Sequence, residues 1–325
     1  TFYRTAKYSN VVNALVNAAR SGKSVTVFME LQARFDEEAN IQLTEKFQEE
    51  GVKVIQAIPG YKVHSKLIFI RRREEHGYMN YVNGSTGNFN ESTARLYADD
   101  AILTANQEIA EDVNRTFYLF EERYVQPQLN SLIIAPFYMR EFFMEMLDNE
   151  MRNARQGKEA RVILKLNNLT DKAIAGKLYE ASQAGVKITL IVRSICVVIP
   201  GVQGLSENID AFSIVDRFLE HSRVLFFHNN ADPRFYITSA DWMPRNFDHR
   251  IETCMPIYDA EIQKELMDML KIQMKDNQKA RIISKERPNQ YRTSNQEERI
   301  RSQVEIYDYL KHKHSTKNKT VEQEE

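Results

Sequence analysis

Two short histidine-containing segments hold the residues best suited to chemistry in this chain. His64-Ser65-Lys66 is followed downstream by Gly84-Ser85-Thr86-Gly87-Asn88, and His221-Ser222-Arg223 is followed by Ser239-Ala240-Asp241. Each segment spaces a histidine and a cation two residues apart, which puts both side chains on one face of a strand. If the segments face each other, two imidazoles and two cations meet. That composition suits attack on phosphorus, with Lys and Arg holding the oxygens.

The recurrence of this pattern favours catalysis over a structural role for the two histidines. A single histidine on a strand is more often structural. His64 and His221, however, occur in matched contexts, each with a cation at the second following position. The histidines His76, His228 and His249 lack such a context, so we expect them to be surface or structural residues.

Three arginines are candidates for binding phosphate. Arg4, Arg34 and Arg193 each follow an apolar stretch typical of a strand. Ligands of parallel α/β sheets gather at the carboxyl ends of strands, and the guanidinium fork suits bidentate contacts with phosphate. We therefore expect a phosphate clamp at these positions. Ordinary ion pairs with carboxylates such as Asp36 remain the alternative.

The small-residue turn after the first histidine offers further donors. Asn88 and Asn90 can donate hydrogen bonds to the same phosphate oxygens that we expect Lys66 and Arg223 to hold. A tight turn alone would also explain the Gly and Asn residues. The sequence leaves both readings of this turn open.

Strands and helices alternate along the chain, which predicts an α/β fold with a largely parallel sheet. Helical spacing of apolar residues predicts helices over 8–20, 36–50, 140–155 and 171–184. Apolar stretches predict strands over 24–31, 52–58, 63–73, 161–166, 187–193, 212–215, 221–227 and 235–238.

The second half of the chain repeats the first. AARSGKSVTV (18–27) and ASQAGVKITL (181–190) align, and the two key histidines lie 157 residues apart (221 − 64 = 157). That spacing is about the length of one small domain, so we interpret the chain as an internal duplication. We expect a first domain over 1–125, a second over 126–312, and a polar, disordered tail over 313–325.

Composition limits the classes of partner and compartment. Lys plus Arg (44) nearly balances Asp plus Glu (45), so any anion site must be local and we expect no nucleic-acid partner. Cys196 and Cys254 lie in apolar settings, which favours buried thiols in a reducing, cytoplasmic compartment, with peripheral membrane association as an alternative. The chain starts without Met or a signal sequence, and we expect it to be a piece of a longer protein.

The motif H-x-K followed by G-S-x-x-N resembles the phospholipase D superfamily. That resemblance implies two similar half-sites combined into one, with one histidine becoming covalently attached to phosphorus. The second copy departs from the pattern because Arg223 replaces lysine, and the usual aspartate after the first motif is missing.

Longer strings resemble the two carboxyl-terminal domains of bacterial polyphosphate kinase, the histidine-phosphorylating class. These strings are LQARFDEEAN (31–40), VHSKL (63–67), STGNFNE (85–91), TARLYADD (93–100), LKLNNLTDK (164–172), SIVDRFLEHSRV (213–224) and SADWMPRN (239–246). They extend over nearly the whole chain.

This resemblance implies a role for individual residues. It implies that His64 is the phosphohistidine nucleophile and that Tyr97, Arg193 and His221 contact ATP. It also assigns Mg²⁺ positions to Arg4 and Arg34. A guanidinium has no lone pair for a metal, so we expect these two arginines to hold phosphate oxygens that in turn bind Mg²⁺.

The activity implied by the resemblance is reversible transfer of the terminal phosphate of ATP to polyphosphate through His64. It also implies homo-oligomerisation and two upstream domains that contribute to ATP binding. One alternative is a phospholipase D-like phosphodiesterase or nuclease, which passes phosphorus to water or an alcohol. Another is a polyanion-binding fragment that is inactive without the upstream domains.

Overall fold

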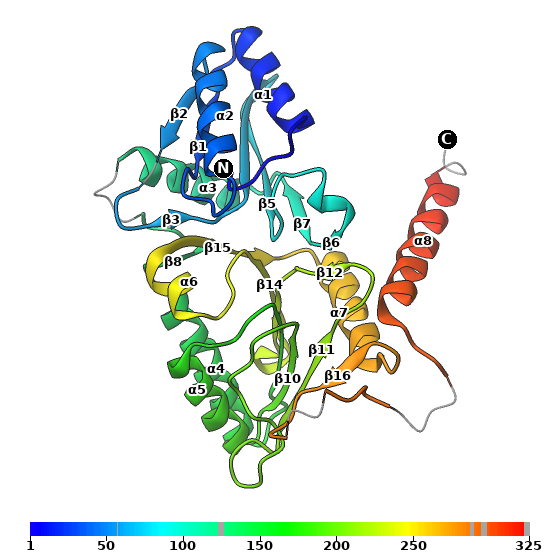
Figure 1. The fold of residues 1–325 in the computed structure, drawn as a ribbon. Coiled ribbons are helices and arrows are strands. Elements are labelled where there is room, and N and C mark those ends of the chain that lie inside the picture. The colour runs from blue at the N-terminus through cyan, green and yellow to red at the C-terminus, as the bar shows by residue number, and fades with distance from the viewer. Residues whose placement is uncertain (57, 123–126, 287–288, 294–297, 322–325) are drawn as a thin grey trace.

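Two α/β halves stack along the long axis of the molecule, and helix α8 stands beside them (Figure 1). The computed structural model describes residues 1–56, 58–122, 127–286, 289–293 and 298–321. The predicted α/β class is confirmed, and all four predicted helices are present within one or two residues of their expected ends.

The first half contains three helices, a parallel strand pair and an antiparallel three-stranded sheet. The helices are α1 (Asn10–Arg20), α2 (Glu37–Glu49) and α3 (Gln107–Glu121), with the short 3-10 helix η1 (Thr93–Arg95). The parallel pair is β1 (Thr26–Met29) and β2 (Lys53–Gln56), and the antiparallel strands are β4 (Leu67–Glu74), β5 (Gly77–Ser85) and β7 (Ala101–Thr104).

The second half is built on one large mixed sheet. Its path is β16-β11-β10-β9-β13-β14-β15-β3, and β8 also pairs with β15. The strands are β3 (Lys62–Val63), β8 (Ile133–Ala135), β9 (Arg161–Leu166), β10 (Lys187–Val192), β11 (Ile209–Ile214), β13 (Val224–Phe227), β14 (Arg234–Thr238), β15 (Arg250–Ile257) and β16 (Ala280–Ile282). The helices are α4 (Met139–Arg155), α5 (Lys172–Gln183), α6 (Pro244–His249), α7 (Ala260–Lys275) and α8 (Ser302–Val321), with the 3-10 helix η2 (Asn229–Ala231).

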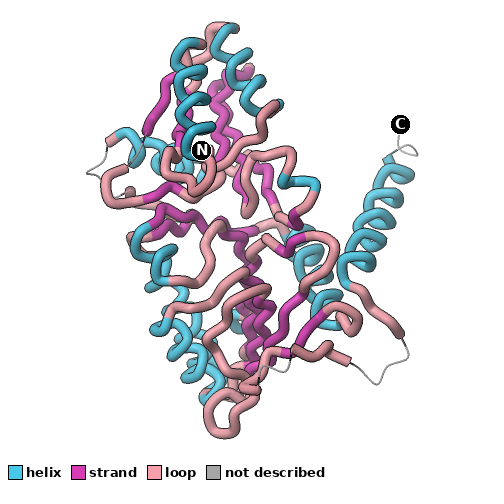
Figure 2. The backbone as a smooth tube through the Cα atoms, viewed as in Figure 1, coloured by secondary structure: helices cyan, strands magenta, loops and turns pink. Residues whose placement is uncertain are grey.

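Apolar side chains bury both faces of the large sheet. On one face, Phe143 and Leu147 of α4 and Leu178 of α5 pack on alternate residues of β9 and β10. On the other face, Leu266 and Leu270 of α7 join a cluster that extends to Leu67, Val82 and Val113 of the first half. Figure 2 shows the strands running down the middle of the second half between these helices. Because one apolar cluster spans both halves, their mutual placement is fixed by core packing.

Two short strands exchange partners between the halves. Strand β3 belongs to the first half by sequence but pairs in parallel with β15. Strand β12 (Leu219–Glu220) belongs to the second half but pairs in parallel with β6 (Tyr97–Ala98) of the first. This exchange decides how the two histidine segments are placed, because each histidine directly follows one of the exchanged strands.

Three expectations from the sequence are corrected. The large sheet is mixed rather than largely parallel, because β13 pairs antiparallel with both β9 and β14, and β15 pairs antiparallel with both β14 and β8. Residues 64–66 and 221–223 lie between strands, so the predicted strands over 63–73 and 221–227 are interrupted there. The tail expected to be disordered from Lys313 instead continues α8 to Val321, where Lys313 lies 2.7 Å from Glu265 of α7. Residues 322–325 lie outside the described part.

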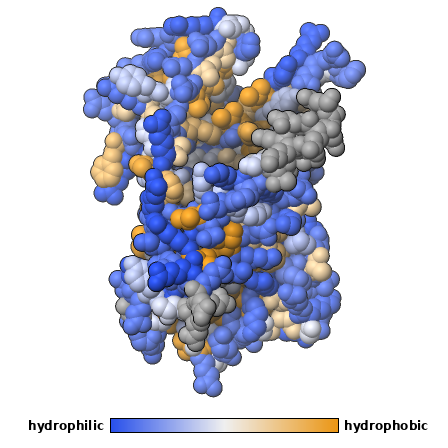
Figure 3. Space-filling model, turned by 90° about the vertical axis from the view of Figure 1, so that its right-hand side faces the viewer, coloured by the Kyte–Doolittle hydropathy of each residue, from blue (hydrophilic) through white to orange (hydrophobic). Residues whose placement is uncertain are grey.

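The surface and the cysteines give less specific information. The face shown in Figure 3 is mostly hydrophilic, with hydrophobic residues confined to patches. Within the described ranges, no helix has the length and apolar character needed to cross a bilayer. Cys254 is buried, Cys196 is partly buried, and no disulfide joins them.

Candidate active site

Each histidine segment is held by the end of a strand from the other half. The main-chain N–H groups of His64 and Ser65 both donate to the carbonyl oxygen of Ile251, at 2.9 and 3.1 Å. Those of His221 and Ser222 both donate to the carbonyl oxygen of Ala98, at 3.0 and 2.9 Å. The two histidines are therefore held by equivalent pairs of hydrogen bonds. The second half supplies the carbonyl for His64, and the first half supplies it for His221.

A carboxylate from the opposite half orients each imidazole. Nδ1 of His64 lies 2.9 Å from Oε2 of Glu252, and Nδ1 of His221 lies 2.7 Å from Oδ1 of Asp99. Glu252 directly follows Ile251, and Asp99 directly follows Ala98, the two residues whose carbonyls hold the histidine segments. A carboxylate on Nδ1 fixes the tautomer that leaves the lone pair on Nε2, so Nε2 is the nitrogen presented for attack.

Sequence reasoning missed Glu252 and Asp99, although the sequence contains a signal for both. A hydroxyl group supports each carboxylate: Thr86 Oγ1 donates to Asp99 Oδ1 at 2.8 Å, and Ser239 Oγ donates to Glu252 Oε2 at 2.5 Å. In both halves the carboxylate lies 13 residues after the hydroxyl residue (99 − 86 = 13 and 252 − 239 = 13). This repeat spacing, taken from the turns already identified, points to both residues. The matched contacts also confirm the internal duplication.

The glycine of the first turn makes room for its carboxylate. A Cβ atom at Gly87 would lie 2.2 Å from Oδ2 of Asp99, far closer than such atoms approach one another. Glycine is therefore required for Asp99 to lie against the turn and still contact His221. The buried Oδ1 of the next residue, Asn88, has no hydrogen-bond partner among the described residues. This side-chain oxygen can accept a hydrogen bond from a ligand donor.

Lys66 and Arg223 each donate to the main-chain carbonyl of the histidine two residues before, but in the described part of the chain only Arg223 is paired with a carboxylate. Nζ of Lys66 donates to the carbonyl oxygen of His64, and Nη1 of Arg223 donates to that of His221 at 2.7 Å. Arg223 also pairs with Asp241 at 3.3 Å. Lys66 is 2% exposed, and no carboxylate of the described chain lies within ion-pair distance of it. Burial lowers the pKa of Lys66 to about 7, so a bound anion would stabilise its charged form.

Burial keeps both imidazoles neutral near pH 7. It lowers the pKa of His64 to about 3, with Glu252 opposing this shift and Lys66 adding to it. Burial also lowers the pKa of His221, and Asp99 opposes it. A neutral imidazole has the lone pair that a nucleophile needs.

The two half-sites adjoin each other. Nη1 of Arg223 lies 3.3 Å from the carbonyl oxygen of Thr86, in the turn of the first half. The charge of Lys66 acts on His221 and contributes to the lowering of its pKa. The residues predicted from the two sequence motifs therefore form one continuous polar region between the halves.

The predicted ATP contacts Tyr97 and Arg193 lie with His221. The ring centroids of Tyr97 and His221 are 5.2 Å apart. Arg193 directs Nη1 to the carbonyl oxygen of Glu220, the residue before His221, at 2.7 Å. Burial and the neighbouring Arg223 both lower the pKa of Arg193, so this guanidinium lies in a region already rich in positive charge.

Arg4 and Arg34 lie instead on the His64 side. The guanidinium of Arg4 stacks on the ring of Tyr3 at 5.1 Å, and that ring lies 4.9 Å from the ring of His64. Nε of Arg4 donates to Asp36 at 2.8 Å. Arg4 therefore forms the ion pair with Asp36 that the sequence offered as the alternative to a phosphate clamp. Arg34 is exposed, lies over the ring of Phe35 at 4.7 Å and has no ion pair within the described ranges.

The side chains at this site do not fit direct coordination of Mg²⁺. Guanidinium groups offer no lone pair to a metal. Across the described residues, no group of three or more His, Cys, Asp or Glu is arranged to hold a metal ion. The site offers hydrogen-bond donors and positive charge, which suit phosphate oxygens rather than a bare cation.

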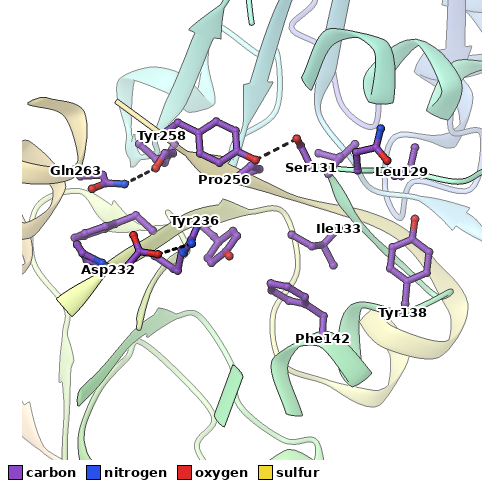
Figure 4. A pocket seen from close by; sticks show the side chains of 16 residues that line it. Leu129, Ser131, Ile133, Tyr138, Phe142, Asp232, Tyr236, Pro256, Tyr258 and Gln263 are labelled. Carbon is purple, nitrogen blue, oxygen red and sulfur yellow. Dashed lines mark hydrogen bonds and ion pairs between the residues drawn. The ribbon is translucent and has the colours of Figure 1, made fainter. Parts of the chain in front are cut away.

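A cavity of about 600 Å³ lies elsewhere, between β14, β15, α4 and the linker around Ser131. Figure 4 shows Phe142, Tyr138 and Tyr236 on one side and Tyr258 on the other, where the Tyr258 hydroxyl donates to Oγ of Ser131 at 3.1 Å. None of the predicted site residues lines this cavity, so it has no part in the chemistry described above.

Comparisons with known proteins agree with this geometry. Residues 1–126 match the family description "Polyphosphate kinase C-terminal domain 1", and residues 132–303 match "Polyphosphate kinase C-terminal domain 2". The polyphosphate kinase of Vibrio vulnificus (strain YJ016) is 49% identical over 319 residues, covering 98% of this chain and 46% of that protein. The chain therefore spans about half the length of the curated relatives it matches.

Solved structures give the same result. The crystal structure of polyphosphate kinase from Porphyromonas gingivalis matches with a TM-score of 0.88 at 41% identity, covering 97% of this chain and 48% of that one. The phosphatidylserine synthase of Haemophilus influenzae Rd KW20 matches with a TM-score of 0.54 at 12% identity, covering 86% of this chain and 80% of that one. The second likeness shows a shared fold only.

Proposed function

The chain belongs to the polyphosphate kinase family, and from this premise we propose that it transfers the terminal phosphate of ATP to polyphosphate through His64. The observation that supports this most is the matched pair of histidine–carboxylate contacts built across the two halves. Two neutral imidazoles and buried cations in one region suit a phosphoryl group that must be received and then passed on. MgATP enters as the substrate, with Mg²⁺ bound to its phosphate oxygens.

In the proposed first step, Nε2 of His64 attacks the γ-phosphorus of ATP. The P–N bond forms as the bond from the γ-phosphorus to the bridging oxygen breaks, and ADP leaves. Lys66 and Arg223 hold the three equatorial oxygens, on which the transition-state charge lies. Asn88 donates to the same oxygens. In this proposal His221, held by Asp99 at 2.7 Å, interacts with the leaving or entering oxygen.

In the proposed second step, a terminal oxygen of polyphosphate attacks the phosphorus of phosphohistidine. The P–N bond breaks, the chain lengthens by one phosphate, and His64 regains its lone pair. Because phosphohistidine is close to a phosphoanhydride in transfer potential, the relay runs in both directions. We assign the acceptance of phosphate to the domain over 1–125 and the ATP contacts at Tyr97, Arg193 and His221 mainly to the domain over 126–312. We also propose a cytoplasmic, homo-oligomeric protein.

The test of this function is a single incubation of the full-length protein with γ-labelled ATP and Mg²⁺. The proposal requires protein-bound label that is labile to acid and stable to alkali, as expected of phosphohistidine, followed by labelled polyphosphate. Hydrolysis of a phosphodiester with no label transferred to polyphosphate would support the phosphodiesterase alternative instead.

Replacing Arg193 or Arg34 by lysine should slow turnover at least about tenfold, which corresponds to about 1.4 kcal/mol at the transition state. Lysine keeps the positive charge but loses the planar fork that binds two phosphate oxygens. Steady-state kinetics of each variant with MgATP gives the answer. Arg115→Lys is the matched control, because Arg115 is a surface residue paired with Glu111 at 3.2 Å. Wild-type kinetics in Arg193→Lys and Arg34→Lys would assign both arginines a structural role.

The chain as given should bind polyphosphate or triphosphate and bind ATP weakly. All the phosphate-binding candidates lie within it, whereas the resemblance places an adenine-side contact in the upstream domains of the family. Isothermal titration with MgATP compares this chain with a version that includes the upstream region. Equal affinities would mean that the upstream region contributes nothing to nucleotide binding.

A further inference from the structure

The first turn of α8 contacts the segment that leads into His221. Nε2 of Gln303 donates to the carbonyl oxygen of Phe218 and to Oε1 of Glu220, both at 2.8 Å. Its Oε1 accepts from the main-chain N–H of Phe218 at 2.9 Å. An amide that donates to and accepts from the same main-chain residue replaces the contacts of a neighbouring strand. Gln303 therefore holds residues 218–220 from the side opposite β6.

The segment needs this support because its own pairing is short. Strand β12 has two residues and pairs only with the two residues of β6. Isolated two-stranded pairs are marginal in water even when they are longer. The amides of Leu219, His221 and Ser222 nevertheless all bond to β6 or the residue before it. Contacts from outside the pair must therefore keep the segment in register.

Glu220 extends the clamp into the core. The residue is 5% exposed, and its carboxylate also accepts from Nζ of Lys165 on β9 at 2.8 Å and from Nε2 of Gln273 on α7 at 3.1 Å. Burial alone would raise the pKa of Glu220, but Lys165 and the two glutamine amides hold it below its ordinary value. Through Lys165, Gln273 and Gln303, the carboxylate of Glu220 links β9, α7 and α8. The main-chain carbonyl oxygen of Glu220 accepts a hydrogen bond from Arg193.

The base of α8 is rigid enough to act as the anchor. The main-chain N–H and Oγ of Ser302 donate to Oδ2 of Asp276 at 2.8 and 2.6 Å. Both groups are buried. Arg301 forms two hydrogen bonds with Asp216, at 2.8 and 2.6 Å, at the beginning of the same loop. Farther along, α8 contacts α7, through Tyr309 and Asp268 at 3.1 Å and Lys313 and Glu265 at 2.7 Å. Among the described residues, the hydrogen bonds from α8 to residues 218–220 all come from Gln303 in its first turn (Figure 1).

We propose that Gln303 is a positioning residue for phosphoryl transfer. It acts through residues 218–220 on Tyr97, Arg193 and His221, and so makes the start of the C-terminal helix part of the active-site architecture. The kinetic part of this inference rests on the proposed function. The positional part does not, because it concerns main-chain hydrogen bonds that can be measured without any reaction.

The experiment compares three variants of the full-length protein. Gln303→Leu removes all three hydrogen bonds, and Gln303→Asn keeps the amide but shortens its reach by one carbon. Gln183→Leu is the matched control, because the amide of Gln183 makes a single surface contact, to the carbonyl oxygen of Gly204 at 2.8 Å. Thermal unfolding shows which variants are folded at the assay temperature. Hydrogen–deuterium exchange and kinetics with MgATP are then measured on those variants.

We expect faster amide exchange at residues 219–222 and at least a tenfold fall in kcat/KM for MgATP in Gln303→Leu, with an intermediate effect in Gln303→Asn. Gln183→Leu should change neither. Unchanged exchange at 219–222 in either folded Gln303 variant would overturn the clamp. Faster exchange with wild-type kinetics would overturn the positioning role. If the wild-type protein transfers no phosphate, the proposed function fails, and the exchange result alone decides on the clamp.

Discussion

Replacing His64 by alanine should abolish both the phosphorylated protein and polyphosphate synthesis. Its Nε2 is the nitrogen left for attack, because Nδ1 contacts Glu252 and no side chain of the described chain bonds to Nε2. Among the described site residues, no other neutral side chain has a nitrogen lone pair without a hydrogen-bond partner from the protein. The His64 side chain is 12% exposed, and in the variant the buried carboxylate of Glu252 keeps its hydrogen bonds from Ser239 and Asn246, so we expect the protein to fold.

The measurement is incorporation of label from γ-labelled ATP into the full-length protein, together with polyphosphate yield. His228→Ala is the matched control, because the ring of His228 lies 3.6 Å from the exposed Glu159, outside the site. That control should keep wild-type labelling. Polyphosphate synthesis by a folded His64→Ala protein would exclude His64 as the covalent site.

Replacing His221 by alanine should reduce synthesis as severely, although His221 itself should never be phosphorylated. Its Nδ1 contacts Asp99 at 2.7 Å, but its Nε2 faces Nη1 of Arg223 at 3.3 Å, unlike that of His64. A guanidinium at this distance competes for the lone pair on Nε2, so we expect His221 to position the reacting groups rather than to attack.

Peptide mapping of the labelled wild-type protein separates the two histidines. All of the label should lie on the peptide that contains His64. Kinetics of His221→Ala then show the loss of turnover, with circular dichroism to show that the variant is folded. Label on the peptide that contains His221, and none on that of His64, would reverse the two roles.

The sequence by itself determined the types of residue at the site and the repeated plan of the fold. Both properties are local: helices and strands follow from the spacing of apolar residues, and the duplication appears as matched strings such as 18–27 and 181–190. The histidine–cation pairs were visible because their members lie two residues apart. For the same reason, the positions of the helices agreed closely with expectation.

Only the tertiary structure decided which carboxylate serves which histidine. Glu252 lies 188 residues from His64, and Asp99 lies 122 residues from His221, so no local pattern connects the members of either pair. The exchange of β3 and β12 between the halves brings them together. The structure also shows that Arg193 lies with His221 and Arg4 near His64, each within its own half. Such contacts arise from the packing of a shared core, whose energy depends on the whole chain rather than on neighbouring residues.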